Sequence, residues 1–415
     1  MKAETDVIVA GAGIAGVTLA LALKSGGLEP LLIDHQTFAD QTAPTFDGRA
    51  SAISFSCFRQ WRAVGAAGFI EKHAQRIEQI LVTDGRSPGA ARPPGMTSYL
   101  RFDSGEIADR VESEPLGYMV ENRHIRAGLA KAVKAAGIEV LAPVRMEGVS
   151  WDSTRASVRL AGGKSRSAPL IVGADGRNSL VRREAGIGTM GWPYSQVGVV
   201  ATVRFETPHQ GAAHEYFLPA GPFAILPLTG DRASLVWTEK KDRGQALMAA
   251  RPEIFEAHLR RRFGDFLGDV SIEGPRFVYP LELQLAEAMA APRAALVGDS
   301  AHGIHPIAGQ GLNLGLKDAA ALAEVLVEAM RLGEDIGSDA VLQRYVRWRR
   351  LDTVALSLAT DVFDRLFSTD LAPVRAARGL GMAVVNRIGP ARRFFMQEAG
   401  GATGDLPRLL RGEAL

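Results

Sequence analysis

Three glycines near the start of the chain have a spacing that can bind a phosphate group. Gly11, Gly13 and Gly16 form a GxGxxG pattern between an apolar run at 6–10 and a helical pattern. Such glycines allow a tight turn and a close approach of pyrophosphate, whose charge the free N–H groups of the helix start can bind. Asp34 ends a second apolar run, where a carboxylate can accept hydrogen bonds from ribose hydroxyls. The pattern predicts dinucleotide binding without distinguishing NAD from FAD.

Two further acidic residues follow apolar runs. Asp175 stands in an Ala-Asp-Gly sequence after 170–173, and Asp299 stands in a Gly-Asp pair after 294–297. Open α/β sheets bind ligands at the carboxyl ends of their strands, which makes both residues candidates for ligand binding. Because Asp-Gly is also a common turn dipeptide, a plain turn is an equally good interpretation for Asp175.

The segment 298–326, GDSAHGIHPIAGQGLNLGLKDAAALAEVL, changes from a glycine-rich to a helical composition. His302 and His305 have HxxH spacing, but no nearby acid or cysteine is an obvious further metal ligand, and Pro306 interrupts the local helix. We therefore expect loop histidines rather than a metal site. The backbone N–H groups that follow can stabilise negative charge on a bound ring, and they belong to Gly309, Gly311 and Asn313.

The composition narrows the class of protein. With 415 residues, of which 47% are apolar, the chain has the size of two globular domains. Its net charge is only +2, which does not indicate binding to nucleic acid. It has no apolar run of about 18 residues and no signal-peptide layout at 1–13. Its one cysteine, Cys57, excludes an internal disulfide and a dithiol redox centre. We therefore predict a cytoplasmic protein.

The last part of the chain is richer in basic residues. Residues 341–415 contain twelve Arg, no Lys and seven Asp or Glu, a net charge of +5. The arginines are spread out, which favours a solvated helical tail. A surface for an acidic partner or an anionic lipid is the alternative. Apolar residues spaced by three or four from Leu351 to Leu366 predict a helical stripe.

The order of the remaining patterns indicates an α/β protein. Apolar runs at 6–10 and 30–34 flank a helical pattern, and a second helix is expected at 124–136, so these runs predict a parallel sheet. Between 198 and 237 short alternating runs are separated by Gly, Pro and Asp. This texture predicts antiparallel strands that cover a cofactor and shape a substrate pocket.

Five stretches together resemble the single-component FAD-dependent aromatic hydroxylases, and most of all those of ubiquinone biosynthesis. They are GAGIAG (11–16), DGRASAIS (47–54), ENRHIRAGL (121–129), GADGRNSLVR (173–182) and VGDSAHGIHPIAGQGLNLGLKD (297–318). The stretch 365–412 is similar to the C-terminal region of the ubiquinone-biosynthesis hydroxylases. The resemblance covers nearly the whole chain.

The resemblance implies a Rossmann-like FAD-binding domain, an antiparallel β-sheet substrate domain and a helical C-terminal region. We expect the FAD-binding domain to be discontinuous, because the substrate domain is inserted in it. The expected ranges are 1–75, 105–185 and 280–330 for the FAD-binding domain, 76–104 and 186–279 for the substrate domain, and 331–415 for the helical region.

The resemblance also implies a role for each matching residue. Those expected to bind FAD are Gly11, Gly13, Ala15, Gly16, Asp34, Arg49, Arg123, Asp175, Gly298, Asp299, Pro306, Gly311, Leu312 and Asn313. Those expected at the reacting flavin ring are Pro306, Gly309, Gly311, Leu312 and Asn313. Arg49 and Arg123 would contact the FAD phosphates or the adjoining chain of the cofactor, and Asp299 the ribityl chain. Asp175 would belong to a motif that links FAD binding with NAD(P)H use.

The implied reaction uses FAD, molecular oxygen and electrons from NAD(P)H or another donor. Reduced flavin would form a C4a-hydroperoxide that transfers oxygen to the ring of a prenylated phenol or quinone precursor. The sequence offers no hydrolytic triad and no obvious general base for the phenol. The implied partners are other ubiquinone-synthesis proteins, a second copy of the chain in a homo-oligomer, and a membrane surface contacted through the C-terminal region.

Two other functions remain open at this point. The same flavin chemistry fits a small soluble phenol or another lipid as the substrate. The chain is also compatible with a flavin-binding assembly subunit that has little activity and is held in a complex through its arginine-bearing tail.

Overall fold

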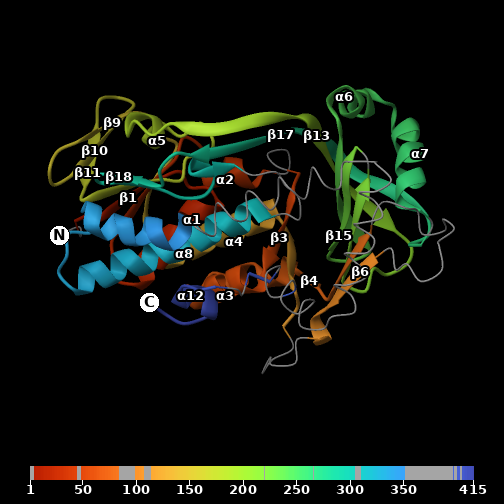
Figure 1. The fold of residues 1–415 in the computed structure, drawn as a ribbon, viewed down its shortest axis with the longest axis horizontal. Helices are drawn as coiled ribbons and strands as arrows, with labels where there is room; N and C mark the ends of the chain where they lie inside the picture. The colour runs from red at the N-terminus through yellow and green to blue at the C-terminus, as the bar shows by residue number, and fades with distance from the viewer. Residues whose placement is uncertain are drawn as a thin grey trace, which may run out of the picture.

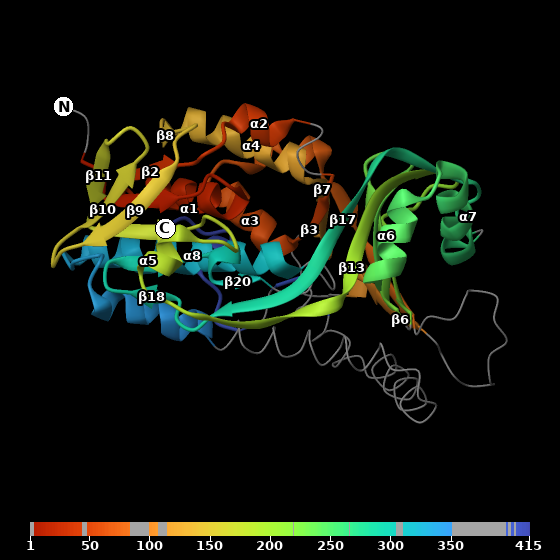
Figure 2. The same ribbon diagram turned by 90° about the horizontal axis from the view of Figure 1, so that it is seen from above.

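The computed structural model describes residues 4–43, 48–83, 99–106, 114–218, 220–264, 266–303, 310–350, 396, 400–401 and 404–415. A body that carries the N-terminus contains a parallel sheet and most of the helices, and a large sheet lies at the other end of the molecule (Figure 1). Two long strands, β13 (Thr189–Phe205) and β17 (Val270–Ala286), run from one body to the other (Figure 2).

The first body is built on a six-stranded sheet. Its strands in spatial order are β18 (Ala290–Ala291), β19 (Ala294–Leu296), β12 (Leu170–Gly173), β1 (Val7–Ala10), β2 (Pro30–Ile33) and β8 (Glu139–Leu141). All neighbours pair in parallel except β18, which is an antiparallel edge. Every residue of β1, β2 and β12 is buried, as expected for a parallel sheet covered on both faces. The predicted parallel sheet is confirmed.

Different elements cover the two faces of this sheet (Figure 1). The helices α1 (Ile14–Ser25), α4 (Asn122–Ala135) and α8 (Gln310–Arg331) lie on one side. A small sheet lies on the other, formed by β9 (Met146–Trp151), β10 (Ala156–Leu160) and β11 (Ser165–Ala168). Helix α1 is apolar around most of its circumference because it packs against the sheet and against both other helices. The helix predicted at 124–136 is present as α4, which begins two residues earlier.

The second body is an eight-stranded sheet. Its order is β20 (His302–Gly303), β17, β13, β16 (Arg232–Lys240), β15 (Gly221–Leu228), β14 (Ala212–Leu218), β5 (Gln79–Thr83) and β6 (Tyr99–Asp103). The antiparallel strands expected between 198 and 237 are confirmed, but β14 and β5 pair in parallel. That pair is free to be parallel because β5 comes from a distant part of the chain and no hairpin joins it to β14.

Two helices, α6 (Lys241–Ala249) and α7 (Pro252–Phe263), pack on the outer face of the large sheet. Trp237 of β16, Phe223 of β15, and Phe255 and Phe263 of α7 are at most 1% exposed and form the centre of this second core. The outer face of the sheet therefore has its own apolar cover, and its inner face is turned toward the first body.

The other described elements are shorter. A short sheet contains β3 (Ala50–Ser54), β7 (Gly117–Glu121) and β4 (Gln75–Ile77). The remaining helices are α2 (Phe38–Thr42), α3 (Phe55–Ala63), α5 (Leu180–Glu184) and α12 (Arg408–Arg411), with 3-10 turns η1 (Ala67–Phe69), η2 (Glu71–His73), η3 (Ser104–Glu106) and η4 (Gly298–Ser300). Residues 339–350 are also helical. The predicted stripe from Leu351 to Leu366 lies outside the described residues, and the domain boundaries stay a prediction.

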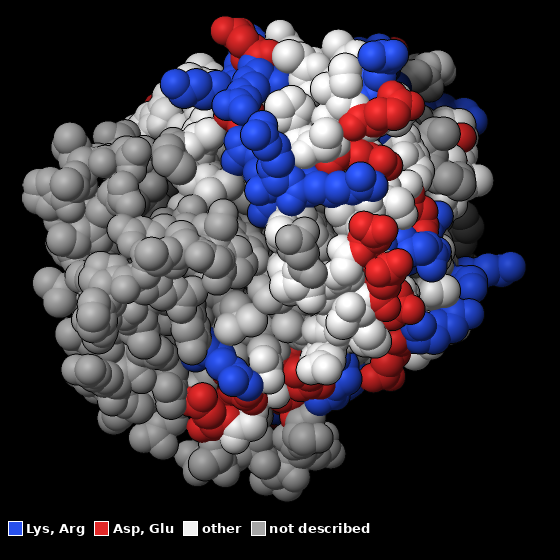
Figure 3. Space-filling view, turned by 90° about the vertical axis from the view of Figure 1, so that its right-hand side faces the viewer, with Lys and Arg blue, Asp and Glu red and all other residues white. Residues whose placement is uncertain are grey.

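The surface over α6 and α7 carries charges of both signs (Figure 3). Arg260 lies 3.9 Å from Glu256, and Arg243 lies 3.7 Å from Glu239. The Arg260–Glu256 pair is partly exposed, whereas Arg243 balances the charge of the buried Glu239, so this surface is mixed rather than one strongly basic patch. None of the described helices is long and apolar enough to cross a membrane.

The position of α1 predicts a large effect of truncating one of its side chains. Leu19 is fully buried, so Leu19→Ala should leave a cavity and lower the free energy of unfolding by about 2–5 kcal/mol. Leu332→Ala is the matched control, because Leu332 is 71% exposed and its loss should change stability by less than about 0.5 kcal/mol. Urea unfolding of both variants tests this, and equal midpoints would contradict the buried position of α1.

Candidate active site

The three glycines of the N-terminal turn have different roles. Gly11 has a φ of +103°, and a Cβ atom there would lie 2.3 Å from the carbonyl oxygen of Ala174. A Cβ atom at Gly16 would lie 2.1 Å from the carbonyl oxygen of Gly11. Gly13 has no atom within 4 Å of a Cβ position, and no side chain caps the helix that it begins. Gly11 and Gly16 therefore serve the turn itself, whereas Gly13 leaves open space in front of free N–H groups.

Asp34 lies at the end of β2, as predicted, and it braces this turn. Its Oδ2 atom accepts a hydrogen bond of 2.7 Å from the N–H of Ala12, and Oδ1 accepts one of 2.8 Å from Gln36. Each carboxylate oxygen can accept a second hydrogen bond, so the expected contact with a ribose hydroxyl remains compatible with this geometry.

Asp175 caps a short helix. Its Oδ2 atom accepts hydrogen bonds from the backbone N–H groups of Leu180 (2.7 Å) and Val181 (3.3 Å). Burial raises the pKa of Asp175 despite these bonds. The following Gly176 has a φ of +78°, as the turn interpretation requires. Asp175 thus holds the turn after β12, next to the cavity-lining residues Ala174 and Gly176.

The N-terminal parts of α1 and α8 meet at Gly298. A Cβ atom at Gly315 would lie 2.9 Å from the Cα atom of Gly298, and Gly298 itself has a φ of +63°. A Cβ atom at Gly298 would lie 3.3 Å from the Cβ atom of Ala15. The next residue, Asp299, has a side chain 55% exposed, with Oδ2 3.7 Å from Nε of Arg177. The two glycine-rich helix starts, almost three hundred residues apart in sequence, therefore belong to one site.

The buried carboxylate of Asp318 stabilises the place where the starts of α1 and α8 meet. It accepts hydrogen bonds from the N–H of Gly298 (3.1 Å) and from Nε of Arg349 (2.9 Å), and it lies 2.5 Å from Nε2 of His302. Burial alone would raise the pKa of Asp318, but the charges of His302 and Arg349 lower it. His302 thus has a scaffolding contact, as expected, and the described residues contain no group of His, Cys, Asp or Glu suited to a metal ion.

The start of α8 brings together the remaining residues expected at the flavin ring. Asn313 is buried, and its amide accepts a hydrogen bond from the N–H of Ser54 (2.9 Å) and donates one to the carbonyl of Ala52 (2.8 Å). Its side chain therefore fixes β3 against α8, whereas Gly311 and Leu312 line a cavity. Pro306, Gly309 and His305 lie outside the described residues.

The two arginines predicted to contact the FAD phosphates or the adjoining chain differ in their position relative to the cavity. Arg49 lines the cavity, with its guanidinium 4.9 Å from the ring centre of Tyr279. Arg123 donates a hydrogen bond of 2.9 Å to Glu121 and does not line the cavity, whereas Arg126, one turn further along α4, does. Arg126 shares the ENRHIR motif with Arg123, but sequence spacing alone could not say which arginine faces the cavity.

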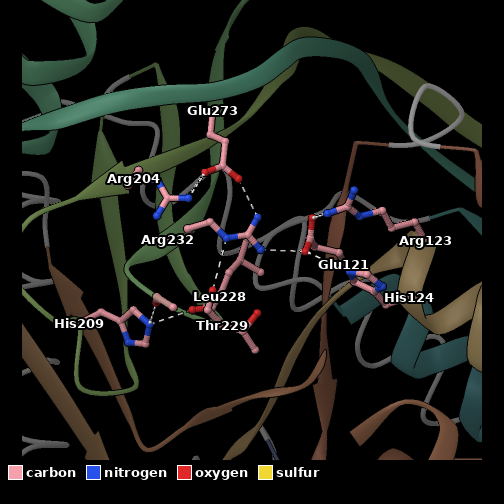
Figure 4. A network of polar contacts seen from close by, with 10 residues as sticks. Glu121, Arg123, His124, Arg204, His209, Leu228, Thr229, Arg232 and Glu273 are labelled. Atoms are coloured by element: carbon pink, nitrogen blue, oxygen red, sulfur yellow. Dashed lines mark hydrogen bonds and ion pairs between the residues drawn. The ribbon is translucent and has the colours of Figure 1, made fainter. Parts of the chain in front are cut away.

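A polar network joins the two bodies beside this site (Figure 4). Arg232 of β16 donates hydrogen bonds of 2.9 Å to Glu121 at the end of β7 and to Glu273 of β17. Burial alone would raise the pKa of Glu121, but hydrogen bonds with His124 and Arg232 lower it to about 2. The ionised Glu121 therefore links α4 to the large sheet.

The cavity between the bodies has a volume of about 590 Å³. One part is lined by the two helix starts, with Gly13, Ala15, Gly298, Asp299 and Leu312. The other part is the inner face of the large sheet, which contributes Ile80, Val82, Ala213, Glu215, Phe217, Pro222, Ala224, Leu226, Val236, Thr238 and Leu281. The sequence analysis missed the residues of this wall because they come from five strands whose register it could not establish.

The residues at the first part of the cavity fit FAD. A cradle free of side-chain atoms lies at Gly13, in front of the uncapped start of α1. Arg49, Arg126 and Arg177 supply positive charge beside it, as a pyrophosphate requires. The backbone of Gly311 and Leu312 at the start of α8 faces the same space. Which FAD atoms each residue contacts stays a proposal.

The different roles of the glycines can be separated by mutation. Gly13→Val should leave the thermal unfolding temperature of the apoprotein nearly unchanged, because its side chain enters open space. It should weaken FAD binding by at least about 100-fold, since the isopropyl group would occupy the expected pyrophosphate position. Gly16→Val should instead destabilise the apoprotein, because its Cβ atom would overlap the backbone. Calorimetry and flavin fluorescence titration measure the two effects, and unchanged FAD affinity in Gly13→Val would refute the assignment.

The lowered pKa of Glu121 predicts a pH-dependent stability difference. Ionised Glu121 stabilises the folded state above its unfolded pKa of about 4.5, and this contribution is lost as the pH falls through about 2. The difference in unfolding free energy between the wild type and Glu121→Gln should therefore shrink between pH 6 and pH 3. Urea unfolding at several pH values measures it, with Glu253→Gln on the exposed side of α7 as the control. A difference that does not change with pH would contradict the ionic link.

Comparison with known proteins identifies the family. Residues 4–356 match a protein family that is described as an FAD-binding domain. The ubiquinone hydroxylase UbiL of Rhodospirillum rubrum is 45% identical over 414 residues, covering 99% of this chain and 93% of the relative. The 3-demethoxyubiquinol 3-hydroxylase of Escherichia coli is 33% identical over 400 residues, covering 95% of this chain and 98% of the relative.

A solved structure supports the fold. The p-nitrophenol 4-monooxygenase PnpA from Pseudomonas putida DLL-E4 superimposes with a TM-score of 0.78 at 18% identity, and the match covers 97% of this chain and 99% of that one. At this identity the similarity shows the fold alone, and it agrees with the α/β architecture predicted from the sequence. The family match and the two relatives show that the chain belongs to the FAD-dependent hydroxylases of ubiquinone biosynthesis.

Proposed function

We propose that this protein is an FAD-dependent monooxygenase that hydroxylates the aromatic ring of a prenylated phenol intermediate in ubiquinone biosynthesis. The observation that carries the proposal is a cavity that joins the glycine-rich helix starts to an apolar wall of about a dozen residues. A cofactor with phosphate groups fits the first part, and an aromatic ring with an apolar chain fits the second. The names of the relatives, a ubiquinone hydroxylase and a demethoxyubiquinol hydroxylase, support the same substrate class.

The residues of the cofactor end would bind FAD by backbone contacts and charge. The N–H groups at the start of α1 would hold the pyrophosphate, Asp34 the adenosine ribose and Asp299 the ribityl chain. N–H groups at the start of α8 would stabilise negative charge on the ring. Once reduced, bound FAD activates molecular oxygen for transfer to an electron-rich ring. Electrons come from NAD(P)H or another donor.

The inner face of the large sheet would bind the substrate and exclude water. Its aliphatic side chains can bury a prenyl chain, at about 25 cal/mol for each Å² of apolar surface removed from water. A dry site also strengthens the electrostatic contacts made at the other end of the cavity. The apolar wall therefore accounts for both substrate affinity and protection of the reaction.

The proposal also includes where the protein works and what it contacts there. The protein works in the cytoplasm as a homo-oligomer, together with other ubiquinone-synthesis proteins. The net charge of +5 on residues 341–415 would favour their contact with the anionic membrane surface from which a prenylated substrate is drawn.

The proposed activity can be tested with protein reconstituted with FAD, supplied with NADPH or a chemical reductant under ¹⁸O₂. A prenylphenol should gain one ¹⁸O atom on its ring, detected by mass spectrometry. Its kcat/KM should exceed that of unprenylated phenol by about 100-fold for each buried isoprene unit. Leu226→Asp, in the apolar wall, should remove this preference, whereas Ile254→Asp on the outer surface of α7 should not.

Three results would count against the proposal. Failure to bind FAD would exclude any flavin enzyme. Equal turnover of phenol and prenylphenol would favour a small soluble substrate. FAD binding without turnover of either compound, under both reductants, would favour an assembly subunit.

A further inference from the structure

Strand β14 places one carboxyl group on the apolar wall of the cavity. Along β14, alternate residues point to opposite faces of the sheet, and Glu215 is on the inner face with Ala213 and Phe217. Its direct cross-strand neighbours are Ala224 of β15 and Val82 of β5, which also line the cavity. An acidic residue therefore interrupts a wall that is otherwise aliphatic at this point.

Within the described part of the chain, the carboxyl group of Glu215 has no contact that would give it a structural role. Among the residues that the structure describes, none forms a hydrogen bond or an ion pair with it, whereas Glu121, Glu239 and Glu273 are all paired with arginines. Burial raises the pKa of Glu215 to about 8. Because a carboxyl group that faces an apolar cavity without a described partner is unfavourable, its presence points to a polar group that binds in the cavity.

The other ionisable side chains of the cavity belong to its cofactor end or are neutral. Arg177 pairs with Glu282 at 2.7 Å and lies 3.7 Å from Asp299. The ring of His214 packs 4.7 Å from that of Phe266, and burial lowers the pKa of His214 to about 4. On the sheet wall, the group suited to exchange a proton near neutral pH is therefore Glu215.

We propose that Glu215 binds the hydroxyl group of the phenolic substrate and takes up its proton while the ring is hydroxylated. This inference rests on the proposed function, and it supplies the general base that the sequence analysis did not find. A carboxylate in a largely apolar wall would also orient the ring, because the hydroxyl would bind to Glu215 while the prenyl chain follows the aliphatic residues.

The proton transfer balances within the catalytic cycle. The O–H bond of the phenol breaks, and its proton moves to an oxygen of the Glu215 carboxylate, which increases the electron density of the ring. After the oxygen atom from O₂ has been transferred, the ring carbon loses its C–H proton to solvent and aromaticity returns. The proton held by Glu215 then returns to the phenolic oxygen, and the carboxylate is restored.

The first test measures binding rather than activity. FAD-loaded wild type and Glu215→Leu are titrated with 4-butylphenol and with its methyl ether, 4-butylanisole, using the flavin absorption spectrum. The wild type should prefer the phenol by about 10-fold, because one hydrogen bond to a buried carboxyl is lost with the ether. Glu215→Leu should bind both compounds equally. Glu253→Leu, the same change on the exposed surface of α7, should keep the preference.

The second test separates proton transfer from binding. Glu215→Gln keeps an oxygen that accepts a hydrogen bond but cannot take up a proton, so it should retain the phenol preference and KM while kcat falls by about 100-fold. FAD content and circular dichroism establish that each variant is folded. If Glu215→Leu does not retain FAD, the kcat and KM of Glu215→Gln alone test whether Glu215 takes up the proton of the phenol.

The outcomes distinguish this inference from the function on which it rests. An unchanged phenol preference in Glu215→Leu, or an unchanged kcat in Glu215→Gln, would overturn the role of Glu215 while the wild type still hydroxylated a prenylphenol. A wild type that hydroxylates no prenylphenol would overturn the proposed function, whatever the binding preference.

Discussion

The close approach of α1 and α8 at Gly298 is the constraint on which the candidate site depends. A Cβ atom on Gly315 would lie 2.9 Å from the Cα atom of Gly298, which is too close for any side chain at position 315. Asp318 fixes this arrangement because its buried carboxylate binds Gly298, His302 and Arg349 at once. Since a buried charge is costly unless fully paired, the three contacts must form together. The result is one cradle lined by two helix starts that would otherwise be separate anion sites.

The second constraint is the attachment of the large sheet to this cradle. Strands β13 and β17 extend from one body to the other, so the backbone itself carries the connection. The Glu121–Arg232 pair adds a side-chain link beside the cavity and joins the end of β7 to β16. The backbone of β13 and β17 and the Glu121–Arg232 pair therefore both keep the apolar wall opposite the cofactor end of the cavity.

The sequence could predict the parts of the site that depend on local backbone geometry. Gly11 and Asp34 stand at fixed positions relative to a strand and a helix, so their pattern indicates the turn directly. The task of the Asn313 side chain was not predictable, because its partners Ala52 and Ser54 are about 260 positions away in the chain. Glu215 was missed for the same reason, since only the pairing of β14 with β5 and β15 places it on the cavity wall.

The burial pattern of the large sheet explains why its inner face needs a ligand. An antiparallel sheet with one face on a core usually alternates between apolar and polar residues. In β15 nearly every residue is buried and apolar, although only the outer face packs against α6 and α7. Ala224 and Leu226 instead border the cavity, with Pro222 beside them. Exposing such a face to water is unfavourable, so an apolar substrate would complete the packing that the protein leaves open, and affinity and specificity would share one origin.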